Sequence, residues 1–466
     1  MKRRLFLHMA GCSLASATLR SRWLHAEQAS GVLEAALSVN RNVPQSTVPA
    51  DFIGLSYESA QLANPAFFAA ENTALITLFR ELGEQGVLRL GGGTSEFTSF
   101  TTEEPKEPVP FDAVGPDTSK NVKGDTRITP RSLRNLRAFL DATNWGCLYG
   151  LNLGRGTAMR AAEEAAYVRR ILGPRLIAFQ LGNEPDAWRN RYRPSTWSYE
   201  DYWKEWIAAH AAVVAKVPQA KFAGPDVSNK INYLTGFAED VKRSCNDVVL
   251  LTSHYYAMGP AGAKGVTVEK LLSPDPKLAR DARAAVEAAR SLGVPYRMSE
   301  GNSCWNGGQP GVSDTLASAL WGVDMMLQFG TLGCAGVNLH GGGNGYYTPI
   351  AGSVSSGFTQ RPEYFGMQLA REFVGGTLLK SELSCNDARV SAYAGHKGGA
   401  EQVLAINKTE HDVAMRVPLR KAHQHWLLAG PSLDAREGVS LTRSEGNAVH
   451  KGMLRVQPWS AVLIRA

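Results

Sequence analysis

The sequence has no long hydrophobic run, no internal repeat and no low-complexity tract. After its first 26 residues, no window supplies the roughly 20 apolar residues that a membrane-spanning helix needs. Hydrophobic residues make up 44% of the chain and charged residues 20%, which is ordinary for a globular protein. These absences argue against a membrane-spanning, disordered or repeat protein.

Cysteine is scarce, and no two cysteines stand in a Cys-x-x-Cys pair. Cys12 falls in the N-terminal 26 residues, and the five that remain are an odd number, so at least one is unpaired. Two histidines, His254 and His340, lie in different strand-like runs. A metal site built on such strands usually needs three or more convergent ligands. We therefore expect no disulfide framework, no metal and no cofactor.

Net charge is also small once the N-terminal segment is set aside. Residues 1–26 contain Arg3-Arg4 ahead of an apolar stretch and end at Ala26, which predicts an export signal that resembles the twin-arginine type. A lipoprotein box around Cys12 is the less favoured alternative. Removing the five cations of this segment lowers the formal charge from +7 to +2. We expect an exported monomer, periplasmic or secreted, without affinity for nucleic acid.

From residue 49 to about 375, strand-like and helical segments alternate. This pattern predicts parallel strands joined by helical crossovers, and eight such units close a (β/α)8 barrel. A doubly wound sheet is the competing topology, but no Gly-x-Gly-x-x-Gly motif follows the first strand. The expected strands are Phe52–Tyr57, Val87–Leu90, Leu148–Asn152, Leu176–Leu181, Phe222–Asp226, Val248–Tyr256, Tyr296–Glu300 and Ala335–His340.

The helical period disappears over residues 376–466. Short runs rich in β-branched and aromatic residues, separated by turn signals, predict an all-β sandwich there. The expected strands are Ala392–Gly395, Gln402–Asn407, Val413–Val417, His425–Ala429 and Leu454–Ile464. The N-terminal segment 27–48 contains a further strand-like run at 31–40, which we expect to cross back and join this sandwich.

Two glutamates occupy ends of the predicted barrel strands. Glu184 follows the apolar run Leu176–Leu181 within Gly-Asn-Glu-Pro, and Glu300 ends the seventh strand ahead of Gly301. Active sites of (β/α)8 enzymes lie where the carboxyl ends of the strands meet, so the two acids are expected to converge. Paired carboxylates without metal-spaced histidines suit cleavage of a glycosidic bond.

Several motifs in one order resemble the heparanase and β-glucuronidase family, glycoside hydrolase family 79. They are Leu88-Arg89-Leu90-Gly91-Gly92, Leu181-Gly182-Asn183-Glu184-Pro185, Gly224-Pro225-Asp226-Val227, Ser253-His254-Tyr255-Tyr256 and Ser313-Asp314-Thr315. The resemblance runs from about Ser56 to the end of the barrel. It implies a retaining enzyme that acts on β-linked glucuronic acid, with Glu184 as acid/base and Glu300 as nucleophile.

The resemblance also implies the residues that bind the substrate. Asn183 would contact the sugar 2-hydroxyl, and Tyr256, or Tyr255 in the other register, would hydrogen-bond the nucleophile. Glu58 and Ser59 would bind sugar hydroxyls. The uronate carboxylate would be held by backbone amides of the turn Asn306, Gly307 and Gly308 and by Tyr347. Asn306 departs from the glycine usual in relatives, although asparagine tolerates positive φ.

Alternatives remain open at this point. The glycine-rich segment from Gly341 to Ser356 is suited to cover a sugar pocket, which favours exo-action on a glucuronate-containing oligo- or polysaccharide. An endo-acting, heparanase-like enzyme is the alternative. A retaining barrel glycosidase for a neutral sugar is a second, and a carbohydrate-binding protein without activity is a third.

Overall fold

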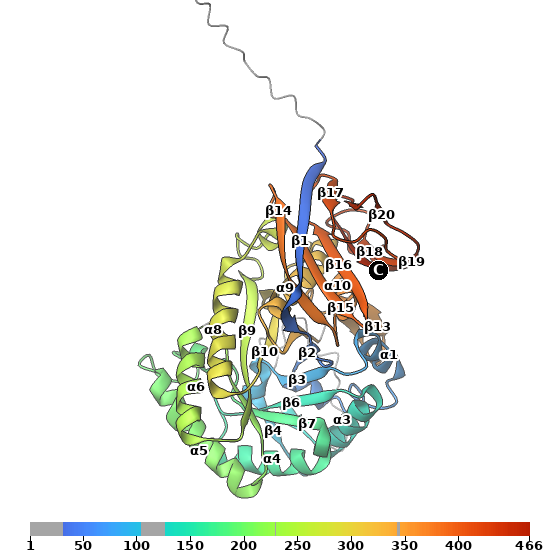
Figure 1. The fold of residues 1–466 in the computed structure, drawn as a ribbon. Coiled ribbons are helices and arrows are strands. Elements are labelled where there is room, and N and C mark those ends of the chain that lie inside the picture. The colour runs from blue at the N-terminus through green and yellow to red at the C-terminus, as the bar shows by residue number, and fades with distance from the viewer. Residues whose placement is uncertain (1–30, 104–125, 229, 343–344) are drawn as a thin grey trace, which may run out of the picture.

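A closed barrel of eight parallel strands forms the centre of the protein (Figure 1). The computed structural model describes residues 31–103, 126–228, 230–342 and 345–466. The predicted export signal and most of the long connection after Gly91 lie outside these ranges. The barrel strands are β2 (Ile53–Glu58), β3 (Val87–Gly91), β6 (Gly146–Leu151), β7 (Leu176–Leu181), β8 (Phe222–Val227), β9 (Val248–Pro260), β10 (Tyr296–Trp305) and β11 (Gly336–Gly341).

Helices surround the barrel; all but α10, which leads to the β-domain, lie in connections between consecutive barrel strands. They are α1 (Thr73–Leu82), α3 (Pro130–Thr143), α4 (Ala158–Leu172), α5 (Tyr199–Lys216), α6 (Ile231–Ser244), α7 (Val268–Leu272), α8 (Pro276–Leu292), α9 (Leu316–Thr331) and α10 (Pro362–Arg371). None of the described helices combines the length and the apolar character needed to cross a membrane. The (β/α)8 prediction is confirmed, and all eight expected strands are present.

Two of the barrel strands continue beyond the rim. β9 and β10 stay paired from Tyr296↔Leu251 to Trp305↔Pro260, so they form a ribbon that rises on the side of the barrel where the strands end. Short strand pairs also lie in the loops, namely β4 (Thr98–Phe100) with β5 (Thr126–Ile128) and β12 (Ile350–Ser353) with β13 (Gly357–Gln360). The β9–β10 ribbon and these two strand pairs extend the face of the barrel at which its strands end.

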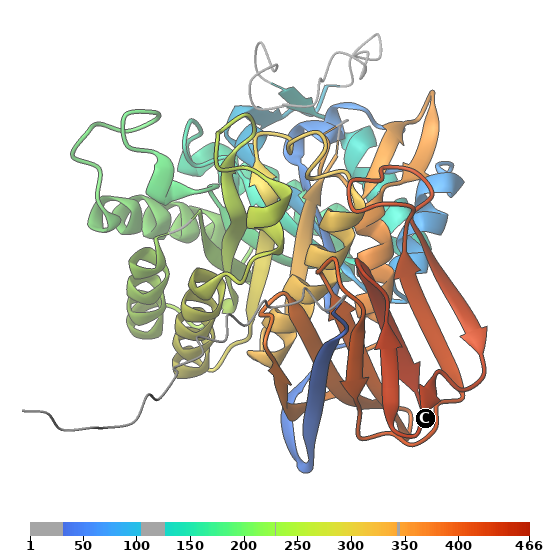
Figure 2. The same ribbon diagram turned by 90° about the horizontal axis from the view of Figure 1, so that it is seen from above.

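The second unit is a ten-stranded sheet that packs beside the barrel (Figure 2). Its strands are β1 (Leu33–Thr47), β14 (Thr377–Cys385), β15 (Val390–Lys397), β16 (Ala400–Asn407), β17 (Val413–Arg416), β18 (Gln424–Ala429), β19 (Ser440–Glu445), β20 (Val449–His450), β21 (Met453–Val456) and β22 (Ser460–Arg465). β1 lies between β14 and β17, antiparallel to the first and parallel to the second. The predicted crossing of the N-terminal strand into the β-domain is confirmed.

The sheet has two apolar faces. One cluster joins β17 and β21 to β16 and β22 and includes Val403, Met415 and Ile464, so the sheet closes over itself as a sandwich. The other face, with Leu404, Trp426 and Leu463 among its buried residues, belongs to the same core as the barrel. Burial on both faces explains the β-branched and aromatic composition of these strands.

The observed elements differ from the predictions in several places, of which β14, the segment Leu454–Ile464 and the start of α1 are examples. The expected strand Leu454–Ile464 is two strands, because Trp459 takes a positive φ of 49° and turns the chain between β21 and β22. β14 was not predicted, since its exposed side chains dilute the apolar pattern. Helix α1 begins at Thr73, where the Asn72 side chain accepts from the Leu75 amide and caps it.

Candidate active site

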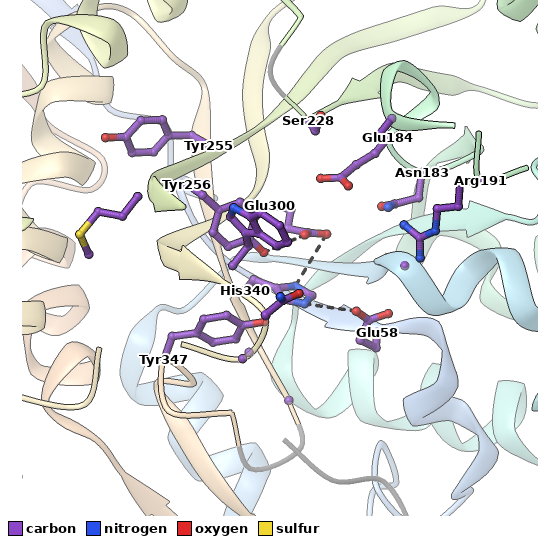
Figure 3. Close-up of a pocket in the computed structure, with 18 of the residues that line it drawn as sticks. Glu58, Asn183, Glu184, Arg191, Ser228, Tyr255, Tyr256, Glu300, His340 and Tyr347 are labelled. Carbon is purple, nitrogen blue, oxygen red and sulfur yellow. Dashed lines mark hydrogen bonds and ion pairs between the residues drawn. The ribbon is translucent and has the colours of Figure 1, made fainter. Parts of the chain in front are cut away.

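Glu184 and Glu300 converge on one space at the C-terminal end of the barrel strands (Figure 3). Carboxylate oxygens of the two residues and a ring nitrogen of His254 all lie within 4.8 Å of one another. Glu184 has left-handed backbone dihedrals, with φ of 51° and ψ of 54°, at the turn after β7. Carboxyl groups about 5–5.5 Å apart are typical of retaining glycosidases, and about 6.5–9.5 Å of inverting ones. The carboxylates of Glu184 and Glu300 are therefore closer together than those of inverting glycosidases.

Glu300 is surrounded by hydrogen-bond donors and positive charge. The Tyr256 hydroxyl donates to its Oε1 at 2.8 Å, and Arg89 donates to its Oε2 at 2.5 Å. Burial would raise the pKa of Glu300, but the charges of His340 and His254 outweigh it. Together with Arg89, they hold the pKa of Glu300 well below its ordinary value. The group is thus kept as a carboxylate.

Glu184 lies in the opposite electrostatic environment. Burial raises its pKa, and the negative charge of Glu300 raises it further. The hydrogen bond with His254 Nδ1, at 3.0 Å, offsets only part of this. Glu300 is therefore held ionised, and Glu184 tends to keep its proton. A displacement assisted by a general acid requires one carboxyl in each of these states.

Arg89, which sequence reasoning left without a role, is the centre of the charge network. Its side chain is 1% exposed, contacts Asp226 in a short ion pair, and donates to Asn183 Oδ1 at 2.7 Å. It also donates to Gln180 Oε1 at 3.0 Å. A Cβ at Gly91 would overlap its guanidinium, so the glycine of the Leu-Gly-Gly motif makes room for it. One cation thus contacts residues of the barrel strands β7, β8 and β10, and of the turn after β7.

Asp226 connects Arg89 to His254 and was likewise given no role from the sequence. His254 Nε2 lies 3.2 Å from its Oδ2. Burial lowers the pKa of His254, but the charges of Glu300 and Asp226 raise it to about 10. His254 is therefore a cation that donates to Glu184, and a protonated imidazole is a poor metal ligand. Although Glu184, His254 and Glu300 converge, they are arranged as an ion-pair cluster.

Glu96 supports the turn that carries Asn183 and Glu184. This buried carboxyl, in the 3-10 helix Gly93–Phe97, accepts from the backbone amides of Leu153, Gly154 and Asn183 at 3.1, 2.5 and 2.7 Å. Burial raises its pKa to about 7 against the effect of these bonds. The residue links the loops that follow β3, β6 and β7, and no sequence pattern singled it out.

The two glutamates face a cavity of about 650 Å³. Of the predicted substrate-binding residues, six line it with the glutamates: Glu58, Asn183, Tyr256, Asn306, Gly307 and Tyr347. Ser59 and Gly308 do not. Ser59 is buried in the 3-10 helix after β2, and Gly308 abuts the backbone of Tyr347. Of the alternatives Tyr255 and Tyr256, Tyr256 contacts Glu300, whereas the Tyr255 hydroxyl donates to Asp275.

The turn predicted to bind a carboxylate has an unusual backbone. Asn306, Gly307 and Gly308 have φ values of 64°, 84° and 83°, so three consecutive residues are left-handed. The Tyr346 amide donates to Gly307 O at 2.5 Å and joins this turn to the loop after β11. Positive φ is tolerated by glycine and, among other residues, best by asparagine, which accounts for this composition.

Glu58 and His340 also face the cavity, with His340 between Glu58 and Glu300 (Figure 3). Glu58 Oε2 accepts from the Thr94 amide at 2.8 Å and from the Thr94 hydroxyl at 2.5 Å. His340 Nε2 lies 3.6 Å from Glu58 Oε1, and its Nδ1 lies 3.8 Å from Glu300 Oε2. The predicted location of both histidines near the glutamates agrees with this geometry.

The barrel and its paired, electrostatically distinct carboxylates define a glycoside hydrolase. The comparison with known proteins agrees with this class. Two curated relatives, each named β-glucuronidase, come from Aspergillus niger and Neurospora crassa. They are both 25% identical, over 73% and 72% of this chain and 68% and 65% of their own lengths. They are consistent with the heparanase and β-glucuronidase family that the motifs resemble. The chain matches no protein-family model.

Solved structures share the two-part architecture. A 4-O-α-L-rhamnosyl-β-D-glucuronidase from Fusarium oxysporum superposes with a TM-score of 0.71 at 17% identity, over 93% of this chain and 100% of its own. A family 51 arabinofuranosidase from Xanthomonas axonopodis gives 0.71 at 14% identity, over 93% and 99%. At these identities the likeness concerns the fold.

Proposed function

We propose that the protein is a retaining β-glucuronidase that removes terminal glucuronic acid from glycans. The observation that carries this proposal is the pair of carboxylates within 4.8 Å, one held ionised and the other with a raised pKa. The curated relatives named β-glucuronidase support the choice of sugar.

The mechanism follows from the two environments. Glu300 attacks the anomeric carbon while Glu184 gives its proton to the leaving oxygen, so the glycosidic bond breaks and a glycosyl ester of Glu300 forms. Glu184, now ionised, takes a proton from water, and the water oxygen displaces Glu300 from the anomeric carbon. Both groups return to their starting states, and the sugar keeps its β configuration.

Recognition of a uronate is supported by the left-handed turn at Asn306–Gly308 and by Tyr347. Asn306 and Gly307 of this turn line the cavity, and backbone amides of a turn are donors that suit an anion. Tyr347 lines the same part of the cavity, and Asn302 donates to its backbone oxygen at 3.1 Å. A carboxylate bound by such donors gains charge-assisted hydrogen bonds.

Exo-action is supported by the loop after β11. Gly342 and Tyr347 of this loop line the cavity together with Gly341 at the end of β11, and the bond from the Tyr346 amide to Gly307 O ties the loop to the turn on the cavity wall. A loop held beside a sugar pocket restricts the room for a continuing chain, which favours a terminal sugar over an internal one.

The proposal is tested by incubating the protein with a glucuronate-terminated oligosaccharide, a long glucuronate-containing polymer and chromogenic glycosides of glucuronate, xylose and glucose. We expect free β-glucuronate as the first product and activity on the chromogenic glucuronide alone. An α-anomer as first product would refute retention. Internal fragments with a fall in viscosity would indicate endo-action, and turnover of a neutral glycoside alone would indicate another sugar.

Removing the Tyr347 hydroxyl should weaken recognition of the uronate. Charge-assisted hydrogen bonds contribute about 1.5–3 kcal/mol, so Tyr347→Phe should lower kcat/KM for the glucuronide about tenfold or more. Tyr346→Phe is the matched control, because this neighbouring ring is 37% exposed and is not among the residues that line the cavity. Equal kinetics in the two variants would remove Tyr347 from the binding site.

A further inference from the structure

A second cluster of ligand-type side chains lies at the end of the barrel opposite the cavity. Cys245 and Asp247 occupy the turn between α6 and β9, where the strand begins. His210 comes from the neighbouring helix α5 (Figure 1). The catalytic glutamates lie beyond the other ends of the strands, so this cluster plays no part in the reaction proposed above.

The three side chains bring a nitrogen, a sulfur and an oxygen together. One ligand atom from each lies within 4.8 Å of the other two, and His210 Nε2 is 2.9 Å from both Asp247 oxygens. In a tetrahedral zinc site the bonds are about 2.0–2.3 Å, which separates neighbouring ligand atoms by roughly 3.3–3.7 Å. Small side-chain rotations would bring the observed atoms to that spacing.

The surroundings hold the ligands in place. The His210 ring stacks on Trp206 with centroids 5.0 Å apart and contacts Phe222 at 4.5 Å. The Asp247 backbone oxygen accepts from the Phe222 amide at 3.0 Å, which fixes the start of β9. The side chains of His210 and Asp247 are only 12% and 17% exposed. Ligands whose positions are set by packing lose little entropy when an ion binds.

Solvent reaches the cluster at Cys245. This residue lines an open groove of about 530 Å³ together with Asn246 and Pro295. A zinc ion held by three protein ligands usually takes water as its fourth ligand.

We infer that His210, Cys245 and Asp247 form a binding site for zinc or a similar thiophilic divalent ion, which joins α5 to the turn before β9. A His–Asp hydrogen bond alone would connect these elements, and it requires no sulfur. The thiol is the feature that a hydrogen bond leaves unexplained. Sulfur and imidazole ligands favour zinc, whereas magnesium and calcium favour oxygen alone.

The test measures zinc binding in the Glu184→Gln background, which weakens the competing cluster at the catalytic site. Titration of the metal-free protein with ZnCl2 should show one equivalent that disappears in Cys245→Ser and persists in Cys385→Ser. Cys385 is the matched control, since it is a free, partly buried cysteine that belongs to no group of metal-ligating side chains among the described residues. At a hundredfold excess over Kd, zinc should raise the melting temperature by about 3 °C.

A thiol-modification experiment on the unsubstituted protein gives an independent readout that needs no variant to fold. ZnCl2 should slow alkylation of Cys245 at least tenfold and leave Cys385 unchanged, with each site quantified by peptide mass spectrometry. Equal rates with and without zinc at Cys245 would overturn the inference. Stoichiometric zinc binding that survives in Cys245→Ser would overturn it as well.

Discussion

Arg89 is the residue on which the charges of the site depend. Its guanidinium pairs with Asp226 and Glu300, and all three side chains are at most 7% exposed. Buried ion pairs of this kind need every partner, because the attraction between them offsets a large loss of hydration. The site is therefore a single electrostatic unit in which a change to one charge alters the pKa of the others.

Replacing Arg89 with Met should destabilise the fold as well as abolish activity. Two buried carboxylates would lose their common cation, and such losses cost about 3–5 kcal/mol. Denaturant unfolding followed by circular dichroism measures the change. Arg290→Met is the control, since Arg290 is 71% exposed and its pair with Glu287 contributes at most about 1 kcal/mol. Equal stability of the two variants would contradict the role of Arg89 as the centre of the network.

Replacing His254 with Gln should shift the pH dependence of kcat/KM in one direction at both limbs. Activity is lost on the acid side when Glu300 is protonated, and on the alkaline side when Glu184 loses its proton. His254 lowers the pKa of both groups, so its removal raises both values. The acid and alkaline limbs should therefore both move to higher pH, as measured with a chromogenic glucuronide. A limb that moves to lower pH would contradict the assigned charge of His254.

Sequence alone indicates the glutamates but not the network that tunes them. Glu184 and Glu300 stand at strand ends before glycine or proline, where a polar residue interrupts an apolar run. Arg89 and Asp226 lie inside such runs. A pattern of apolar residues does not indicate which charged side chains pair across the barrel. Glu96 is a loop acid by spacing, and only the folded chain shows that it accepts three amides.

Among the strands of the β-domain, β1 is the one whose position most affects the integrity of the sheet. It is an internal strand of the ten-stranded sheet, with β14 on one side and β17 on the other. Its residues Ala35 and Leu37 are buried in the core between the two halves of the sandwich. The strand also continues past a register shift at Pro44 to Thr47, further than residues 31–40 suggested.

A chain that begins at Pro49 should therefore lose more than an edge strand. Without β1, β14 and β17 have no partner on their facing sides, and the sheet divides into two parts with new hydrogen-bonding edges. We expect a melting temperature lower by 5 °C or more, roughly the effect of several kcal/mol in a chain of this size, together with aggregation. An unchanged melting temperature in differential scanning calorimetry would show that β1 contributes little.

The elements of the barrel were predictable because each buried strand is a short apolar run that ends at a turn residue. β14 was not, because alternate side chains point to solvent and its sequence, Thr-Leu-Leu-Lys-Ser-Glu-Leu-Ser-Cys, has a weak period. The hairpin of β12 and β13 was missed for the same reason, since β13 is largely exposed. Local pattern identifies elements buried on both faces better than those at the surface.

At the scale of the whole molecule, a buried ion pair joins the barrel to the β-domain. Asp324 in α9 contacts Lys408 Nζ at 2.5 Å, and it accepts from the Tyr393 hydroxyl at 2.6 Å. Both charged side chains are at most 6% exposed. Since the same core runs through this contact, the two domains should unfold as one unit.

Asp324→Asn should destabilise that unit. The buried ammonium of Lys408 would lose its counter-charge at a cost of about 3–5 kcal/mol. Calorimetry should show a lower melting temperature, with Glu287→Gln on the exposed pair as a control that leaves it nearly unchanged. If the variant gave two separate transitions with the barrel transition unmoved, Asp324 would stabilise the β-domain alone.

The central place of β1 also sets an order for biosynthesis. Ser38 and Glu382, which pair across β1 and β14, are 344 residues apart in sequence. A ribosome therefore delivers β1 first and its partners only after every barrel strand has been made. During that interval β1 is an unpaired strand with buried-type residues, open to association with other chains. The sheet that contains β1 can therefore form only when synthesis has passed β17.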